Sequence, residues 1–314
     1  MSFNYKKLIR NQNTRFLILK LLNFIPDSVM LKLQYKLKMG RSLNLKSPKR
    51  FTEFLQYYKI NYRNPVLGQC VDKYEVRSYI NAKGLQTILN DLYCVCDDAE
   101  KIDFSKLPNQ FVLKTTDGGG GENVIICKDK LSADLDEIKA KLSKWKNKKN
   151  VNAGREWAYT QIKKSRIIAE KYLENTENSE AGIEDYKFLC FSGVPKYVII
   201  DKDRYIGHKR NFYTIDRQKI DVDSDCKQFS EDYKFPVNYD EMVEIAKRLS
   251  EDFPFVRVDL YNINGKIIFG ELTFYPWSGY VQFTPDDFDF KLGQEIESFG
   301  SMKKYGGGYE SIVN

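Results

Sequence analysis

The chain has 314 residues, of which 42% are hydrophobic, 14% aromatic and 30% charged, and its formal net charge is +7. This composition excludes a disordered polymer and predicts a folded protein with room for two or three packed subdomains. The apolar run at 16–26 contains Lys20 and is too short for a membrane span, and it lacks the small-residue cleavage site of a signal peptide.

The positive charge is concentrated at the N-terminus. The first fifty residues contain twelve lysines or arginines and one acid, Asp27, so this segment has a net charge of +11 and the remainder −4. It predicts two helices separated by Pro26 and Asp27, the second ending at Gly40, and a third helix over 47–60. Two interpretations stay open. The arm binds an anionic membrane surface, or it packs on the body with its charge solvated or facing an anionic polymer.

Helices and hairpins alternate through the rest of the chain. We expect a helix at 72–84, a strand–glycine loop–strand unit at 107–130, an exposed helix at 133–150 and a strand at 166–173. Two hairpins are expected at 184–204 and 253–274, with an amphipathic helix at 238–253 between them and a last helix near 289–300. This alternation predicts an α+β fold.

Lys114 and the glycines at 118–121 form the first chemical motif. In FVLKTTDGGGGENVIIC, Lys114 lies on a strand that the glycines join to a second strand. Glycine lets the backbone approach an anion closely and present several N–H groups to it. No G-K-[ST] follows and no helix begins there, so the loop is neither a Walker loop nor a dinucleotide fingerprint. It predicts a flap over phosphates, with an ordinary hairpin tip as the open alternative.

A strand end in RIIAEKYLEN forms the second motif. Its last residues are Glu170, Lys171, Tyr172 and Leu173, which offer main-chain groups at a strand edge. A carbonyl and the N–H two residues on can pair with the amine and ring nitrogen of an adenine. On its own, this stretch is more simply explained as an ordinary strand end.

The mostly apolar stretch FPFVRVDLYNINGKIIFGELTF contains two acids, Asp259 and Glu271. Buried carboxylates need partners. A two-residue turn at 264–265 would place these acids on opposite faces of the hairpin, whereas a three-residue loop with a bulge at Gly265 places Arg257, Asp259, Glu271 and Thr273 on one face.

We expect the second register, because it leaves a single apolar face that includes Val258, Ile268 and Leu272. The two acids are then diagonal neighbours that repel each other unless a cation bridges them. Hard oxygen ligands suit Mg²⁺, which also takes phosphate oxygens. The alternative is a salt-bridged sheet face in which Arg257 neutralises one acid.

Six scattered cysteines form no C-x-x-C pair, and the only histidine is His208. This pattern excludes His-rich metal sites, argues against a Ser-His-Asp hydrolase and favours reduced thiols in a cytoplasmic protein. We expect Cys94 and Cys96 on opposite faces of a strand. The sequence offers no credible Ser–His or Cys–His couple, so no covalent protein nucleophile is expected.

Together, these features resemble the ATP-grasp superfamily, and more closely its teichuronopeptide-type (TupA-like) branch, found with genes for bacterial surface polysaccharides. The resemblance covers nearly the whole chain, and the segments that carry it are LNLKSPKRFTEF, DKYEVRSYI, LPNQFVLKTTDGGGG, RIIAEKYLE, DYKFLCFSG, HKRNFYTID and VRVDLYNINGKIIFGELTFYPWSG. It implies an α+β ATP-grasp fold, in which two α+β subdomains grip ATP between antiparallel sheets, with an N-terminal helical extension.

The resemblance also implies five divisions of the chain. They are a basic helical arm at 1–65, a pre-ATP-grasp segment at 66–108, subdomain 1 with the flap and adenine hinge at 109–173, subdomain 2 with the metal-binding hairpin at 174–299, and a glycine-rich tail at 300–314.

Individual roles follow from the same resemblance. The residues implied for the nucleotide are Lys73 and Lys114 at the phosphates, Gly118, Gly119, Gly120 and Gly121 in the covering loop, Glu170, Lys171 and Leu173 at adenine, and Asp185 and Lys187 near ribose and phosphate. The residues implied for Mg²⁺ are Asp259, Glu271 and Thr273. Thr273 stands where relatives commonly have asparagine, and Asp117 where many have histidine; Asp117 is expected to point away from the phosphates or to pair with a lysine.

The residues implied for catalysis are Arg257, Lys114 and Arg210. Arg257 would stabilise an acyl-phosphate oxyanion, and Arg210 with His208 would hold an anionic substrate, although an ordinary surface loop explains these last two equally well. The implied reaction needs ATP and Mg²⁺: a carboxylate attacks the γ-phosphate, and an amine then displaces phosphate to form an amide.

The family's setting alone implies a small-molecule or polysaccharide-precursor carboxylate, such as a sugar acid of capsular or other cell-surface polysaccharide, and an amine. No nucleic acid partner is expected, and the protein is expected in the cytoplasm, with peripheral contact at the inner membrane face if the arm binds lipid. Two alternatives stay open. One is a metal-dependent glycosyltransferase that uses the acids of DVDSD at 221–225, and the other is a non-catalytic nucleotide-binding protein, which Thr273 and Asp117 keep open.

Overall fold

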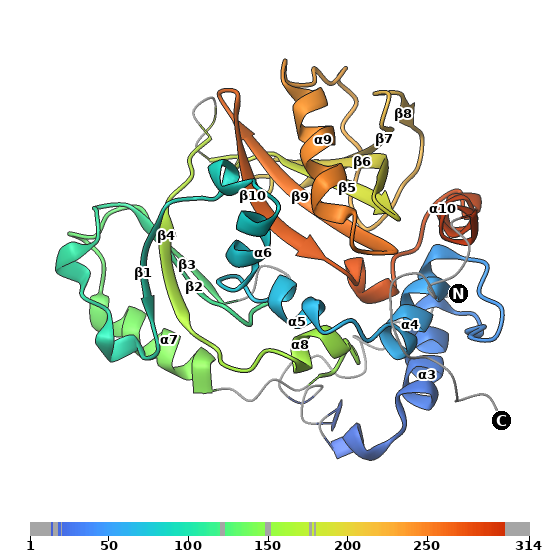
Figure 1. Cartoon of the computed structure of the whole chain (residues 1–314), viewed down its shortest axis with the longest axis horizontal. Coiled ribbons are helices and arrows are strands. Elements are labelled where there is room, and N and C mark those ends of the chain that lie inside the picture. The colour runs from blue at the N-terminus through green and yellow to red at the C-terminus, as the bar shows by residue number, and fades with distance from the viewer. Residues whose placement is uncertain are drawn as a thin grey trace.

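Two antiparallel sheets lie on opposite sides of the molecule in the computed structural model (Figure 1). The structure describes residues 14, 18, 19, 21–119, 123–147, 152–175, 178 and 180–298. The expected glycine-rich tail at 300–314, most of the expected first arm helix, and Gly120 and Gly121 lie outside these residues.

The smaller sheet has the strand order β1 (Leu92–Cys96), β4 (Ile167–Lys171), β2 (Phe111–Thr115) and β3 (Val124–Cys127). Side chains alternate along a strand, so Phe111 and Leu113 of β2 pack on one face against Leu142 of α7 (Leu135–Asn147). Lys114 and Glu170 lie on the other face, away from α7, and the larger sheet lies on that side (Figure 1). The polar alternation of these strands therefore creates a charged inner surface.

The larger sheet has the strand order β10 (Lys266–Thr273), β9 (Phe255–Ile263), β5 (Asp185–Phe191), β6 (Val194–Lys202), β7 (Lys209–Thr214) and β8 (Lys219–Ile220). The amphipathic helix α9 (Tyr239–Ser250) covers one face through a core that includes Met242, Leu249, Phe188 and Val258. The hairpin turn of β5–β6 falls at Ser192–Gly193, within the predicted SGVP, and both residues have positive φ, 49° and 81°.

The opposite face of the larger sheet is divided into two parts. Leu189, Ile199 and Phe212 form an apolar part that packs against α4 (Phe51–Asn61) and α10 (Asp287–Ser298). Lys187, Arg257 and their neighbours form a charged part. The apolar part anchors the sheet to its helices and leaves the charged part for chemistry.

The remaining described elements connect these layers. They are η1 (Leu22–Phe24), α3 (Asp27–Met39), α5 (Val66–Val71), α6 (Val76–Ala82), η2 (Gln86–Ile88), η3 (Ala99–Lys101), η4 (Phe104–Lys106), α8 (Trp157–Thr160) and η5 (Pro276–Gly279). Helix α3 ends at Gly40 as expected, with a φ of 74° that favours glycine. None of the described helices is both long and apolar enough to cross a membrane.

The cysteines confirm one expectation and contradict another. All six cysteines are free, as expected. Cys94 and Cys96 were expected on opposite faces of β1, which is wrong: their sulfur atoms lie 3.9 Å apart on one face. A strand repeats its side-chain direction every second residue, so two cysteines separated by one residue share a face.

Candidate active site

The β9–β10 hairpin places two carboxylates directly opposite each other. Its turn is the two-residue Asn264–Gly265, with φ of 52° and 80°, and the expected three-residue loop is wrong. The register shifts instead at a bulge between Phe269 and Glu271. Gly270 fills this bulge, where an added Cβ would lie only 3.0 Å from the carbonyl oxygen of Asp259.

The bulge brings the polar side chains of the hairpin to one face. This shared face was predicted from the sequence, but it was attributed to a three-residue loop. Asp259 pairs with Glu271, and Arg257 with Thr273, so all four side chains share one face. The two acids are directly opposed, not diagonal as expected. Ile268 was expected on the apolar face, but Ile267 is the residue that joins the core under α9. The bulge lies between Phe269 and Glu271, so the pairing between the turn and the bulge keeps the register of a two-residue turn.

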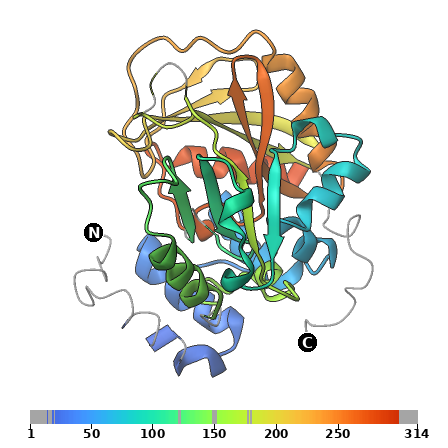
Figure 2. The same cartoon turned by 90° about the vertical axis from the view of Figure 1, so that its left-hand side faces the viewer.

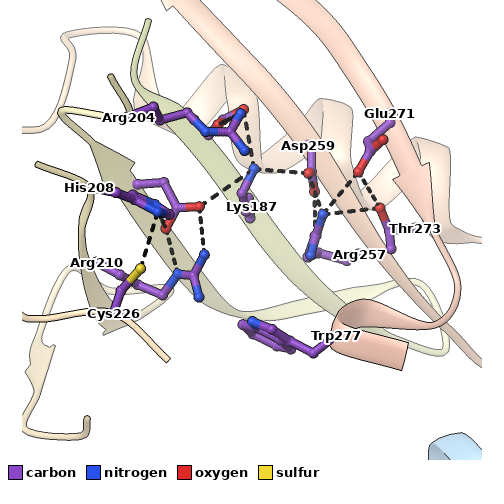
Figure 3. A network of polar contacts seen from close by, with 12 residues as sticks. Lys187, Arg204, His208, Arg210, Cys226, Arg257, Asp259, Glu271, Thr273 and Trp277 are labelled. Atoms are coloured by element: carbon purple, nitrogen blue, oxygen red, sulfur yellow. Dashed lines mark hydrogen bonds and ion pairs between the residues drawn. The ribbon is translucent and has the colours of Figure 1, made fainter. Parts of the chain in front are cut away.

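Arg257 is the cation that holds both acids (Figure 3). Its Nε and Nη2 donate to Asp259 Oδ1 and Oδ2, both at 2.7 Å, and Nη2 also lies 3.1 Å from Glu271 Oε1. Thr273 accepts a further hydrogen bond from Nη2 at 3.1 Å and donates to Glu271 Oε1 at 2.8 Å. One guanidinium therefore satisfies a pair of carboxylates that would otherwise repel each other.

The two acids differ in their titration. Burial raises the pKa of Asp259, and the attraction of Arg257 and Lys187 only partly offsets it. Burial also acts to raise the pKa of Glu271, but Arg257, Lys187 and Lys73 together bring it below its ordinary value. The side chain of Glu271 is 44% exposed, and that of Asp259 is almost fully buried. Glu271 is therefore the acid more accessible to a ligand.

Lys187 extends this cluster along β5. Its Nζ lies 3.1 Å from Asp259 Oδ2, 3.2 Å from Asp185 Oδ1 and 3.9 Å from Asp201 Oδ2. Arg204, after β6, contacts the other oxygen of Asp185 at 2.7 Å. Buried acids and bases thus form one continuous network across three strands, and their charges largely neutralise each other.

Arg210 ends the network on β7. It donates through Nε and Nη2 to the two oxygens of the buried Asp201, at 2.5 and 2.9 Å, and it also contacts Asp225. Its guanidinium carbon lies 5.3 Å from the centre of the Trp277 ring, and Trp277 Nε1 donates to Asp225 at 3.1 Å. Trp277 belongs to η5, directly after β10, so an indole and an arginine stand at the edge of the site.

His208 and Cys226 lie in contact, although they are eighteen residues apart in the chain. The sequence offered no credible Cys–His couple, yet His208 Nδ1 lies 3.1 Å from Cys226 Sγ, and His208 Nε2 lies 3.4 Å from Asp201 Oδ1. Burial raises the pKa of the Cys226 thiol, which the nearby Arg210 only partly offsets. A thiol whose pKa is raised is a poor nucleophile, so the contact alone does not make this pair a covalent catalyst.

Lys73 and Lys114 bring positive charge from the side of the smaller sheet. The backbone N–H of Lys73 donates to Thr116 O at 3.0 Å, and its Nζ contacts the carbonyl of Gly118 in the glycine loop. Loss of solvation lowers the pKa of Lys73, and the attraction of Glu271 partly offsets this effect. Lys73 therefore lies where the loop, the smaller sheet and the acids of the larger sheet approach one another.

Lys114 is held by the acid expected at adenine. Its Nζ lies 2.8 Å from Glu170 Oε2, and Arg77 lies 3.7 Å from Glu170 Oε1. Asp117 accepts a hydrogen bond from Ser165 Oγ at 2.8 Å and forms no salt bridge with a lysine in the part of the chain that the structure describes. This hydrogen bond gives the acid of the loop a neutral partner.

The strand end expected at adenine lies beside a cavity of about 290 Å³. The carbonyl oxygen of Lys171 accepts a hydrogen bond from Asn90 Nδ2 at 2.9 Å. The side chain of Lys171 is half exposed and lies near Asp91. Tyr172 follows β4 directly and lines the cavity, and Leu173 is the next residue. The other lining residues are Ile126, Lys128, Glu180 and Tyr205.

The donor set fits a divalent cation carried with phosphates. No group of three or more His, Cys, Asp or Glu residues that could hold a metal ion occurs within the described ranges. Asp259 and Glu271 supply two hard oxygen ligands, and the bridging Arg257 shows that the pair requires a positive partner. Two carboxylates are the protein share typical of Mg²⁺, with water and phosphate oxygens completing the shell.

The acids of DVDSD are engaged in structural contacts. Asp221 and Asp223 accept hydrogen bonds from Gln228 Nε2 at 3.1 and 3.0 Å, and Asp225 contacts Arg210 and Trp277. These partners give the motif a role in holding loops together.

Sequence reasoning missed Arg204, Asp201 and Trp277. Arg204 and Asp201 lie beside DYKF in the folded sheet but follow it in the chain by more than ten residues. The alternation of apolar and charged residues in PKYVIIDKDR was a signal for Asp201, whereas nothing local marked Trp277.

One family model matches most of the chain. The model of the family described as TupA-like ATPgrasp matches residues 53–297. Among solved structures, D-alanine–D-alanine ligase from Bacillus anthracis is 18% identical with a TM-score of 0.43, covering 74% of this chain and 67% of that chain. The same enzyme from Helicobacter pylori is 16% identical with a TM-score of 0.43, covering 79% and 67%. A RimK domain ATP-grasp protein from Sphaerobacter thermophilus is 10% identical with a TM-score of 0.39, covering 74% and 68%.

The chain thus spans about two thirds of the length of these solved proteins. No curated protein matches it. The family match extends from α4 to α10 and includes both sheets and every residue of the charged network. The chain belongs to the TupA-like ATP-grasp family and has the α+β ATP-grasp fold.

Proposed function

We propose that this protein is an ATP- and Mg²⁺-dependent carboxylate–amine ligase. The observation that carries the proposal is the pair of carboxylates, Asp259 and Glu271, that Arg257 bridges on the larger sheet, together with Lys73 in contact with the glycine loop of the smaller sheet. Two acids for a cation and several bases for phosphates are the parts that phosphoryl transfer needs, since it depends on positioning and charge neutralisation.

Each side chain has a defined task in this reaction. Asp259 and Glu271 would hold Mg²⁺, which when bound neutralises charge on the phosphates. Lys73 and Lys114 would hold phosphate oxygens beneath the glycine loop, and Lys187 would do so from the larger sheet. For Lys114 this requires release from Glu170, its partner at 2.8 Å.

The bonds change in two steps. A carboxylate oxygen of the substrate attacks the γ-phosphorus, and the bond to the β-phosphate oxygen breaks to release ADP. The nitrogen of an amine then attacks the acyl carbon, inorganic phosphate leaves with the electron pair of the acyl–oxygen bond, and the proton lost by the nitrogen passes to the phosphate. Arg257 would stabilise the negative oxygen that develops at the acyl carbon.

The edge formed by Arg210 and Trp277 supports an anionic carbohydrate as the acid. Arginines bind carboxylates well, and an indole provides a flat apolar surface for the face of a sugar ring. Arg210 is oriented by Asp201 and lies beside Trp277. We therefore propose a sugar acid of a cell-surface polysaccharide pathway, a setting that rests on the family resemblance.

Trapping with hydroxylamine tests the reaction. The full chain is incubated with Mg²⁺, ATP and a panel of uronic acids and their nucleotide-activated forms, and ADP and hydroxamate are measured. ADP release that depends on the acid, together with a hydroxamate, is expected because hydroxylamine intercepts an acyl phosphate. If ATP raises the melting temperature but no acid causes its turnover, a non-catalytic nucleotide-binding role is favoured. A larger shift with a UDP-sugar than with ATP would favour a glycosyltransferase.

A further inference from the structure

Helix α3 presents an unusual exposed face. Successive residues of a helix turn by about 100°, which places Val29, Leu33, Leu37, Lys32 and Lys36 within less than half of its circumference. All five are exposed, and the three aliphatic side chains retain 54%, 49% and 36% of their surface. This face thus combines an apolar stripe with lysines and contains no acid.

The opposite face of α3 fixes the helix to the body. Leu31, Tyr35 and Met39 are buried in a cluster with Leu43, and Tyr35 Oη lies 2.8 Å from Thr52 Oγ1. Gln34 Nε2 also donates to Ala153 O at 3.0 Å, and Gln34 Oε1 accepts from Tyr280 Oη at 2.8 Å. The helix therefore cannot rotate to bury Leu33 and its neighbours without breaking these contacts.

Two more exposed apolar side chains precede α3, at η1 and the residue before it. Phe24 is 82% exposed, and Leu21 is 66% exposed. Arg155 fixes this segment, because it donates to Leu22 O at 3.0 Å and to Asp27 Oδ1 at 2.9 Å. The salt bridge also neutralises Asp27, which is the one acid of the first fifty residues.

We propose that the face formed by Leu21, Phe24, Val29, Lys32, Leu33, Lys36 and Leu37 docks on the surface of an anionic lipid bilayer. Interfacial helices place apolar side chains below the headgroups and lysines among them. Lys32 and Lys36 pair with no acid of the described ranges, so both charges are available to lipid phosphates. The net charge of +11 over the first fifty residues is complementary to such a surface.

The position of α3 agrees with docking. Both views place α3 and η1 at the periphery of the molecule, outside α4 and away from the two sheets (Figures 1 and 2). Contact with a bilayer through this edge leaves the charged network between the sheets open to soluble ligands. A protein docked in this way keeps its active site beside the membrane surface.

Vesicle flotation of the full chain tests the proposal. The vesicles are phosphatidylcholine alone, and phosphatidylcholine with one third phosphatidylglycerol. Flotation is expected with the anionic vesicles, and Lys32→Gln/Lys36→Gln should lower the partition coefficient by about 25-fold, at about fivefold per charge. Phe24→Ser/Leu33→Gln should lower it by more than about tenfold at every lipid composition.

Matched variants elsewhere on the surface provide the controls. Leu131→Gln removes a leucine that is 89% exposed outside the arm, and Lys141→Gln/Lys144→Gln removes two charges from α7. Both should float like the unaltered chain. All these side chains are at the surface, so unchanged melting temperatures should show that the variants fold.

Four results would overturn docking through this face, and the fourth concerns the charge variants. The first is no flotation of the unaltered chain, and the second is equal flotation of Phe24→Ser/Leu33→Gln. The third is a concentration-dependent dimer in sedimentation that Leu33→Gln abolishes, which would assign the face to a second copy of the chain. Equal losses in the α3 and α7 charge variants would mean that overall charge, not this face, drives binding.

Discussion

Lys59 is a lysine buried beneath the loop that follows the β9–β10 hairpin. Its side chain has no exposed surface, and its Nζ donates to Ser278 O at 2.9 Å and to Ser278 Oγ at 3.0 Å. Burial lowers its pKa from 10.5 to about 7, although Glu156 at 3.9 Å opposes the effect. Replacing Lys59 with methionine, which has a similar shape and no charge, should therefore change the pH dependence of stability.

Whether the free energy of unfolding rises or falls with pH depends on which state, folded or unfolded, binds more protons. Between roughly pH 7 and pH 10.5 the unfolded chain carries a proton on Lys59 that the folded chain lacks, so the free energy of unfolding rises with pH. Over that whole window the gain is about 5 kcal/mol, and about 2.5 kcal/mol of it should fall between pH 6 and pH 9. Below the folded pKa both states are protonated, and the contribution remains at its lowest.

Urea unfolding near pH 6 and near pH 9 measures the effect. The pH difference in unfolding free energy should be about 2.5 kcal/mol smaller in Lys59→Met than in the unaltered chain. Lys141→Met, at an exposed position of α7, should leave the difference unchanged. If Lys59→Met retains the full difference, Lys59 titrates normally and is not sealed from water.

Four further predictions concern the proposed active site. Asp259→Asn and Glu271→Gln should each abolish ATP turnover while the protein stays folded, and isothermal titration with Mg²⁺ and an ATP analogue should show weaker binding; full activity in either variant would contradict the metal assignment. Lys114→Ala should remove hydroxamate formation, because it withdraws a fixed charge from the phosphates, and Lys114→Arg is the matched control for charge. Gly270→Ala should lower stability by about 1–3 kcal/mol, since the new Cβ would meet Asp259 O at 3.0 Å, and a normal melting temperature would argue against the bulge. Cys226→Ala should retain hydroxamate formation, because the proposed chemistry needs no protein nucleophile; loss in Cys226→Ala but not in Lys141→Met would point to a covalent role for the thiol.

The sequence predicted the hairpin face correctly but assigned it to the wrong cause. A hairpin with a single apolar face needs Asp259 and Glu271 on the same side, and with a regular two-residue turn they would lie on opposite sides. The hairpin therefore needs one extra residue in one strand or in the turn. That residue was placed in the turn at Gly265, whereas it is Gly270 that forms the bulge. A glycine inside a strand pattern is itself a signal for a bulge, and Gly270 was that signal.

Other features depend on contacts that no local pattern reveals. Cys226 meets His208 because the segment after β8 runs beside the start of β7, where Lys227 bridges Lys209. The register that aligns Asp201 with Arg210 is set by the whole sheet. Lys59 lies one helical turn after Leu55 on the buried side of α4, so its spacing indicated burial. Its partner Ser278 lies more than two hundred residues away, and only the folded chain reveals it.

Arg257 already occupies the role of counterion at the two acids that would receive the metal. Its guanidinium lies 2.7 Å from Asp259 and 3.1 Å from Glu271, so a bare divalent ion must displace it and leave it without a partner inside the protein. Nucleotide phosphates offer the displaced guanidinium a new partner at the moment the metal arrives. On the proposed function, free Mg²⁺ should therefore bind weakly on its own. The metal should instead enter together with ATP, as one complex.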